Sequence, residues 1–169
     1  NSYEGLCEYF GGKYISYTEE RPITMNPFRI NREEMNVEKT GFLKNLVLLI
    51  WKGTQGTVTK TEDRLIEHVI TEYYDAYFNG FEGFTPQQRE DLRKSLVIDD
   101  RNSSEKRHES ERERAVRIEG IIDEIEGRRK ELKVEELSFN SFYEYSVQRI
   151  PDICEENRIT GIDLSTYRY

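Results

Sequence analysis

The chain is poor in cysteine and histidine, and it lacks any long hydrophobic run. Its 169 residues contain two cysteines, Cys7 and Cys154, which are too few and too far apart for a disulfide framework or a zinc site. We interpret both as small hydrophobic core residues of a protein from a reducing compartment. The longest apolar run, Leu46–Trp51, is much shorter than the ~20 residues of a membrane-spanning helix. These shortages predict a soluble, cytoplasmic domain without a membrane span.

Positive charge is scarce relative to negative charge. Lys and Arg number 25 against 33 Asp and Glu, which gives a formal net charge of −8. A nucleic-acid-binding face needs an excess of Lys and Arg to neutralise phosphates, so we do not expect nucleic acid as a partner. With 36% hydrophobic and 34% charged residues, the chain suits one helical domain with a thin core and a large solvated surface.

Motifs for catalysis and metal binding are missing as well. The chain has no G-x-x-x-x-G-K-[S/T] loop, whose backbone N–H groups and lysine hold phosphates in nucleotide-binding proteins. Its two histidines, His68 and His108, have no second ligand at metal-binding spacing. The acidic pair Asp99–Asp100 follows an amphipathic stretch, so we interpret it as a helix end or a loop. We therefore predict no catalytic residue, no metal site and no enzyme activity for this chain.

The sequence divides into three parts: residues 1–30, 31–157 and 158–169. The first part predicts a short helix and then two strands, over 13–17 and 22–25, where β-branched and aromatic residues lie between Gly, Glu and Pro. Two strands do not make a stable sheet alone, so this part is interpreted as a remnant of a larger α/β layer. The last part predicts a turn leading towards another strand. The predicted fold class is mainly α, with a small β appendage.

Residues 31–157 carry helical periodicity and clear helix-end signals. The apolar spacing predicts a helix over Val37–Lys52 that Gly53 terminates. Thr59 and Glu62 have capping-box spacing, which predicts the start of the next helix. The apolar face expected on that helix consists of Ile66, Val69, Ile70, Tyr73 and Tyr77.

The second half of this helical region is more highly charged. Thr85-Pro-Gln-Gln88 predicts a helix start, with Thr as the cap and Pro at the first position. Residues 99–104 predict a linker, and residues 105–114 a solvated, partly disordered arm that becomes helical. Ser138 or Ser141 is expected to cap a last helix. The apolar stripes expected on the last two helices are Ala115, Ile118, Ile122, Ile125 and Leu132, and then Tyr143, Val147 and Ile150.

Four segments of the chain carry a resemblance to a known family. They are the Ser-Tyr helix at Ser2–Leu6, the Gly-Gly turn and strand at Gly11–Tyr17, the I-T-M-N-P-F block at Ile23–Phe28, and the element Leu137–Tyr145. With these segments the sequence resembles the TraG family of conjugative-transposon ATPases, the motor proteins of DNA transfer systems similar to type IV secretion. The resemblance covers essentially the whole chain. The Asn-Pro-Phe block is its moderately specific motif, whereas the helices alone are not specific.

The resemblance implies a helical insertion domain attached to a remnant of an α/β P-loop ATPase core. The phosphate-binding loop and the second nucleotide motif are then expected outside this fragment. ATP and Mg²⁺ would belong to the parent ATPase, and no catalytic residue is carried over. Asn26 and Pro27, at the end of a core strand, are expected near the nucleotide side of the parent fold. Ile15, Ile23 and Met25, which would face the missing sheet, are expected to be exposed or self-associated.

The resemblance also implies partners and a location. The expected partners are the rest of the ATPase core and neighbouring ATPase subunits or secretion-channel components, at the inner, cytoplasmic face of the membrane. The expected role is structural and partner-contacting, without nucleotide hydrolysis by this piece. The alternative is a stand-alone helical adaptor that binds a partner through residues 103–133.

Overall fold

The computed structural model of the chain describes residues 26–101 and 109–167. Within these ranges the chain is helical and forms no strand, which confirms the predicted mainly α class. The elements are the 3₁₀ helix η1 (Arg32–Glu34) and the α-helices α2 (Val37–Lys52), α3 (Lys60–Phe78), α4 (Pro86–Arg101), α5 (Glu111–Glu131) and α6 (Phe139–Glu156). No helix in the described part of the chain has both the length and the hydrophobicity to span a membrane.

The predicted β appendage can be compared with the structure only in part. The strands expected over 13–17 and 22–25, Cys7 and the apolar residues Ile15, Ile23 and Met25 lie outside the described residues. Residues 158–167 form a loop that contains a turn and no strand. The ring of Tyr167 lies edge-on to that of Trp51, with 5.4 Å between the ring centroids. This segment therefore packs back onto α2 and does not add to a sheet.

Both ends of α2 and the start of α3 follow local sequence signals. The Asn36 side chain accepts a hydrogen bond from the Lys39 N–H (2.9 Å), and Gly53 ends α2 with a φ of 75°. A side chain is strained at that φ, so glycine is the favoured residue. The Thr59 hydroxyl accepts from the Glu62 N–H (3.1 Å), and the Glu62 carboxylate accepts from the Thr59 N–H (2.9 Å). The predicted bounds of α2 and the capping box of α3 are confirmed.

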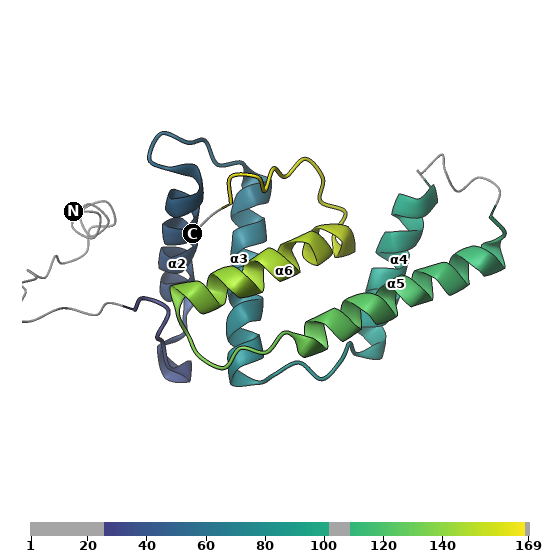
Figure 1. Cartoon of the computed structure of the whole chain (residues 1–169), viewed down its shortest axis with the longest axis horizontal. Coiled ribbons are helices and arrows are strands. Elements are labelled where there is room, and N and C mark those ends of the chain that lie inside the picture. Colours follow the sequence, from purple (N-terminus) through teal and green to yellow (C-terminus); the bar gives the residue numbers. More distant parts are fainter. Residues whose placement is uncertain (1–25, 102–108, 168–169) are drawn as a thin grey trace, which may run out of the picture.

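Helices α2, α3 and α6 form a three-helix body around the larger hydrophobic core. Figure 1 shows α2 and α3 side by side, with α6 crossing them. The predicted apolar face of α3 is fully buried at Ile66, Val69, Ile70 and Tyr73. Tyr77 is 39% exposed, so its predicted burial is wrong. It lies in the last turn of α3, where its ring contacts Phe78 at 5.2 Å between centroids.

Helices α4 and α5 pack on each other beside the three-helix body and have a small apolar cluster of their own (Figure 1). Thr85 and Gln88 exchange the predicted capping hydrogen bonds, at 3.1 and 2.8 Å. The linker predicted over 99–104 is wrong at its start, because α4 continues to Arg101. Aspartate and arginine do not stop a helix as Gly or Pro does. The buried residues of the cluster are Leu92, Leu96, Ile118 and Ile122.

The observed faces of α5 and α6 differ in part from the predicted ones. Ile118, Ile122 and Ile125 are buried as expected, whereas Ala115 is exposed because α5 meets the cluster only from Ile118 onwards. Ser138 caps α6 by accepting from the Ser141 N–H (3.0 Å), and the helix runs through Pro151 to Glu156. Val147 is 43% exposed and not inward as predicted. The residues of α6 that face the core are Phe142, Tyr145, Arg149, Ile150 and Ile153.

Candidate functional site

Asn26, which the sequence placed at a candidate site, fixes the start of the described chain to a loop far away in the sequence. Its side-chain amide donates to the carbonyl of Leu137 in the α5–α6 connection, at 2.6 Å. Its side-chain oxygen accepts from the Phe28 N–H (3.1 Å), and its carbonyl accepts from the Arg29 N–H (3.1 Å). These bonds close a tight turn around Pro27. The turn therefore presents Phe28 to the core.

Phe28 is completely buried between α3 and α6. Its ring stacks on Phe142 at 5.0 Å between centroids and meets Phe139 edge-on at 4.9 Å. The hydroxyl of Tyr74 donates to the Phe28 carbonyl at 2.7 Å. Burying a phenylalanine side chain contributes about 1.5–3 kcal/mol. Asn26, Pro27 and Phe28 thus form an anchor, called the Asn-Pro-Phe anchor below, that holds the chain to the three-helix body.

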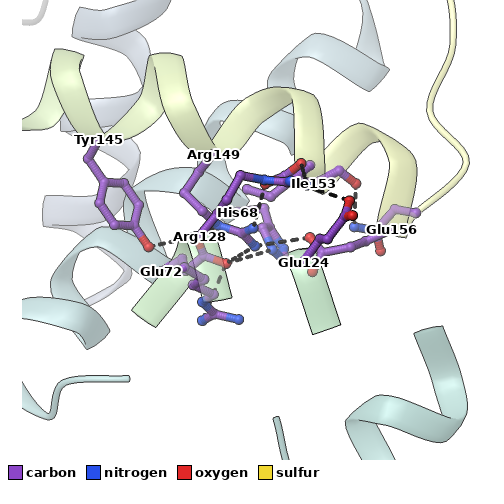
Figure 2. A network of polar contacts seen from close by, with 11 residues as sticks. His68, Glu72, Glu124, Arg128, Tyr145, Arg149, Ile153 and Glu156 are labelled. Atoms are coloured by element: carbon purple, nitrogen blue, oxygen red, sulfur yellow. Dashed lines mark hydrogen bonds and ion pairs between the residues drawn. The ribbon is translucent and has the colours of Figure 1, made fainter. Parts of the chain in front are cut away.

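A buried ion pair between α3 and α6 forms the centre of a polar network (Figure 2). Glu72 accepts from Arg149 at both carboxylate oxygens, at 2.7 and 2.8 Å. It also accepts from the Tyr145 hydroxyl (2.7 Å), and the Arg129 guanidinium lies 3.3 Å away. The side chains of Glu72 and Arg149 are only 6% and 2% exposed. Such a pair is stable only when hydrogen bonds satisfy both charges, as they do for Glu72 here.

The outer part of the network ties α5 to α6. Arg149 also donates to Glu156 at 3.0 Å. Arg128 of α5 makes a two-pronged contact with Asp152 of α6, at 3.0 and 2.9 Å. Figure 2 shows the side chains of Glu72, Arg128 and Arg149 converging from α3, α5 and α6. Together with Arg129 and Glu72, the Arg128–Asp152 pair fastens α5 to the three-helix body.

Burial and ion pairing have opposite effects on the pKa values of Glu72 and Glu156: burial raises each pKa, and contact with arginine lowers it. Burial raises the pKa of Glu72, but the hydrogen bonds and charges of Arg149 and Arg129 outweigh it and hold that pKa below its ordinary value. Burial raises the pKa of Glu156, and the single contact with Arg149 does not compensate for it. Glu72 is therefore the firmly ionised member, and Glu156 is the carboxyl that protonates more easily.

A polar cavity of about 510 Å³ borders the network between α3, α4 and α6. The pocket is open to solvent, and its lining includes Glu72 and Arg149 together with Arg129 of α5. His68 lies at its edge with 53% of its side chain exposed, and its Nε2 is 3.9 Å from Glu72. That position agrees with its predicted place beside the apolar stripe. Within the described residues, no three His, Cys, Asp or Glu side chains gather as a metal site would require.

Comparison with known proteins decides the family. The sequence profile of the TraG P-loop domain matches residues 1–87, which is more than half of the chain. The chain belongs to the TraG P-loop family. The family resemblance drawn from the sequence is thereby confirmed over residues 1–87, and this part is a region of a conjugation-related ATPase. The resemblance predicted beyond residue 87, which includes Leu137–Tyr145, stays a prediction. No curated protein and no solved structure matches the chain.

The TraG match ends inside the fold and not at its edge. It includes the Asn-Pro-Phe anchor, α2 and α3, and it stops within the first turn of α4. Phe142 and Arg149 lie beyond residue 87, yet they cover the ring of Phe28 and neutralise Glu72. Side chains of α6 therefore cover the apolar side chain of Phe28 and neutralise the charge of Glu72, although the profile does not include α6.

Sequence reasoning missed the polar network, although a signal for it was present. Glu72 lies between Val69 and Tyr73 on the apolar face of α3, and Arg149 occupies the same kind of position on α6. A charged residue on an otherwise apolar face indicates a buried ion pair when a second helix offers the opposite charge. Which two residues would meet depends on how α6 crosses α3, and one sequence does not specify that angle.

Proposed function

We propose that this chain is the helical region of a conjugative-transfer ATPase, with a structural and partner-contacting role and no nucleotide hydrolysis by itself. The observation that carries the proposal is the Asn-Pro-Phe anchor. Phe28 is fully buried, and Asn26 is bonded to the loop before α6. The anchor fixes the chain at residues 26–28 to α3 and to the α5–α6 connection. A displacement of the chain at Asn26 would therefore be passed on to the three-helix body.

In this proposal ATP and Mg²⁺ are bound by the parent ATPase at motifs that the present sequence does not contain. The chain has no G-x-x-x-x-G-K-[S/T] loop to hold phosphates. Its partners would be the rest of the ATPase core and neighbouring subunits or secretion-channel components, at the inner face of the membrane.

The α4–α5 pair is the surface that we assign to those neighbouring proteins. It extends from one side of the three-helix body and has its own apolar cluster (Figure 1). Arg89 joins the two helices by ion pairs to Glu119 (2.9 Å) and Asp123 (2.8 Å). Val116 of α5 is 69% exposed. A pair of helices with its own internal contacts can bind a partner without disturbing the larger core.

Substitution of Asn26 in the parent ATPase tests the structural role. Asn26→Ala removes the bond to Leu137 and loosens the anchor, so we expect DNA transfer to fall while ATP turnover stays unchanged. Asn140→Ala, at an exposed position on α6, is the control and should change neither. A fall in ATP turnover would contradict the anchor role and place Asn26 and Pro27 at the nucleotide side. Unchanged transfer together with unchanged turnover would refute both roles.

The isolated chain gives a second test. We expect no ATP hydrolysis and no ATP binding by the 169-residue chain. Hydrolysis that survives repurification, and that disappears on mutation of a described residue, would overturn the proposal in favour of an enzyme.

The alternative role, a stand-alone adaptor, is favoured by one observation. The α4–α5 pair has an apolar cluster separate from the larger core, as a binding arm would. An adaptor predicts that the isolated chain binds a channel component as tightly as the parent ATPase does. A part of an ATPase predicts that binding requires the parent assembly.

A further inference from the structure

The buried apolar side chains of the described fold divide into two separate clusters. The larger one joins α2, α3 and α6, and the smaller one lies within the α4–α5 pair (Figure 1). Ile125 of α5 is also completely buried, and within the described residues it belongs to neither cluster. A unit with its own core can change its orientation without unfolding, unless a large apolar interface fixes it to its neighbour.

The junction between the α4–α5 pair and the three-helix body is mainly polar. Arg128 of α5 bonds to Asp152 of α6 at 2.9 and 3.0 Å, and Arg129 lies 3.3 Å from Glu72 of α3. Ile125 precedes these arginines by one helical turn on the same face, so it is the apolar side chain that α5 brings to the junction. On the other side, α4 faces α3 and the end of α6 across the open pocket of about 510 Å³.

The three-helix body keeps its central charge balanced without the arginines of α5. Glu72 accepts two hydrogen bonds from Arg149, at 2.7 and 2.8 Å, and both residues belong to the body. It accepts a third from the Tyr145 hydroxyl, at 2.7 Å. Loss of the contact with α5 therefore leaves Glu72 paired and avoids the cost of an unpaired buried charge.

The chain passes from the body to α4 through residues 79–85, which are fixed at both ends. Asn79 is held to the body, because its side chain accepts from Arg32 at 3.1 Å. The Phe84 N–H is held to α5, because it donates to Glu126 at 2.8 Å. Gly80, which has a φ of 78°, lies between these two points. Since glycine adopts a wide range of backbone conformations, Gly80 is the place where this connection can bend.

The chain returns from α5 to the body at a second place where it can bend. Leu132, Val134 and Leu137 of the return connection pack against the larger core, and the Leu137 carbonyl accepts from Asn26 at 2.6 Å. The last residue of α5, Glu131, is exposed. The second bend therefore lies between Glu131 and Leu132. The 21 residues of α5 extend roughly 30 Å from this point, so a small rotation here moves the far end of the helix by many Å.

Carboxylates from three helices surround Arg128 at the junction. Besides its bonds to Asp152, Arg128 lies 4.0 Å from Glu124 of α5. Burial raises the pKa of Glu155, and so do the charges of Asp152, of Asp99 on α4 and of Glu124, whereas Arg128 lowers it. The carboxylates of α4, α5 and α6 are therefore close enough to repel one another, and Arg128 offsets this repulsion.

We propose that the α4–α5 pair is a hinged unit that swings away from the three-helix body about Gly80 and the end of α5. The ion pair between Arg128 and Asp152 is the latch that holds it closed, as in the structure. When the latch is broken, repulsion between the carboxylates favours the open state, while Glu72 keeps Arg149 as its partner. The hinge does not depend on the partner role proposed above for the same pair of helices.

Distances between spin labels on α3 and α5 test the hinge in the full chain. The labels are placed at the exposed positions Glu67→Cys and Ala115→Cys, with Cys7→Ala and Cys154→Ala as the background. We expect one narrow distance distribution when Arg128 is present. Arg128→Gln removes a two-pronged, charge-assisted contact, so it should raise the ratio of open to closed molecules at least about tenfold and add a second distance. An unchanged distribution in Arg128→Gln would overturn the latch.

Two controls separate a swing of the α4–α5 pair from local unfolding. Arg112→Gln, at an exposed position on the same helix, should leave the distribution narrow, and a second distance in this variant would overturn the assignment to Arg128. Labels at Lys94→Cys and Ala115→Cys report the distance between α4 and α5, since Lys94 is 70% exposed on α4. This distance should stay the same in Arg128→Gln. If it broadens, the pair unfolds locally and does not move as one unit, which would refute the hinge.

Discussion

Arg149 is the largest side chain that the described fold buries completely, and groups from its own and neighbouring helices balance its charge. Glu72 receives two of its hydrogen bonds and Glu156 a third. Removing one partner of a buried ion pair leaves the other charge uncompensated in the interior, which costs far more than an exposed pair is worth. The stability of the α3–α6 contact therefore depends strongly on this single residue.

Arg149→Met should destabilise the fold by about 3–5 kcal/mol, because it leaves the Glu72 carboxylate buried without its main partner. Urea unfolding at neutral pH measures the change. Arg64→Met, at an exposed position on α3, is the control and should change stability by less than about 0.5 kcal/mol. The double variant Glu72→Gln/Arg149→Met should regain part of the loss. A double variant as unstable as the sum of the two single ones would show that the pair is not coupled.

The two glutamates of the network should give opposite contributions to the pH dependence of stability. The pKa of Glu72 is lowered by folding, so its contribution is present above about pH 4.5 and is lost as the pH falls further. The pKa of Glu156 is raised, so its contribution is present below about pH 4.5 and is lost as the pH rises. Glu72→Gln should therefore make acid destabilisation shallower, and Glu156→Gln should make it steeper. Urea midpoints between pH 3 and 7 measure both slopes, and slopes of the same sign would contradict the assignment.

At the scale of the element, the boundary between α2 and α3 was predictable because its signals are local, whereas the end of α4, which has no Gly or Pro, was not. Gly53 and the Thr59–Glu62 capping box fix the boundary between α2 and α3 through contacts within four residues. The rotation of a helix about its axis was less predictable. Val147 was expected to face inwards, but α6 is turned so that Arg149 meets Glu72. That orientation depends on Glu72 of α3, so the periodicity of α6 alone does not predict it.

Thr59→Ala should destabilise the fold by about 1 kcal/mol, because it leaves the Glu62 N–H at the start of α3 without its side-chain acceptor. Chemical denaturation measures the change. Thr61→Ala, two residues further on and exposed, is the matched control and should have little effect. Equal losses for the two variants would show that the hydroxyl of Thr59 is not acting as a cap.

At the scale of the whole molecule, the part that belongs to the TraG profile does not contain a complete core. Residues 26–87 provide Phe28, α2 and α3, whereas two of the rings that cover Phe28, those of Phe139 and Phe142, come from α6. The sequence predicted a helical region over 31–157, and the described helices fall within it. It did not predict that α6 packs on α3 while α4 and α5 form a separate cluster, because that choice depends on contacts between distant segments.

A chain that ends at residue 87 should therefore fail to fold. Without α6, Phe28 and Tyr73 lose the aromatic rings that pack on them. We expect weak helical circular dichroism and no cooperative thermal transition, whereas a chain of residues 26–167 should show both a strong helical signal and a sharp transition. A cooperative transition in the shorter chain would refute the requirement for α6.

The bond between Asn26 and Leu137, 111 residues apart, has a consequence for synthesis on the ribosome. The residues up to 87 leave the ribosome first, but the binding site of Phe28 is complete only when α6 has also emerged. At ~5–20 residues per second, translation of residues 88–156 takes roughly 3 to 14 s. During this interval the nascent chain presents an unburied aromatic cluster. The helices of this TraG protein therefore fold late in translation, and chaperones that recognise exposed apolar segments have several seconds in which to bind it.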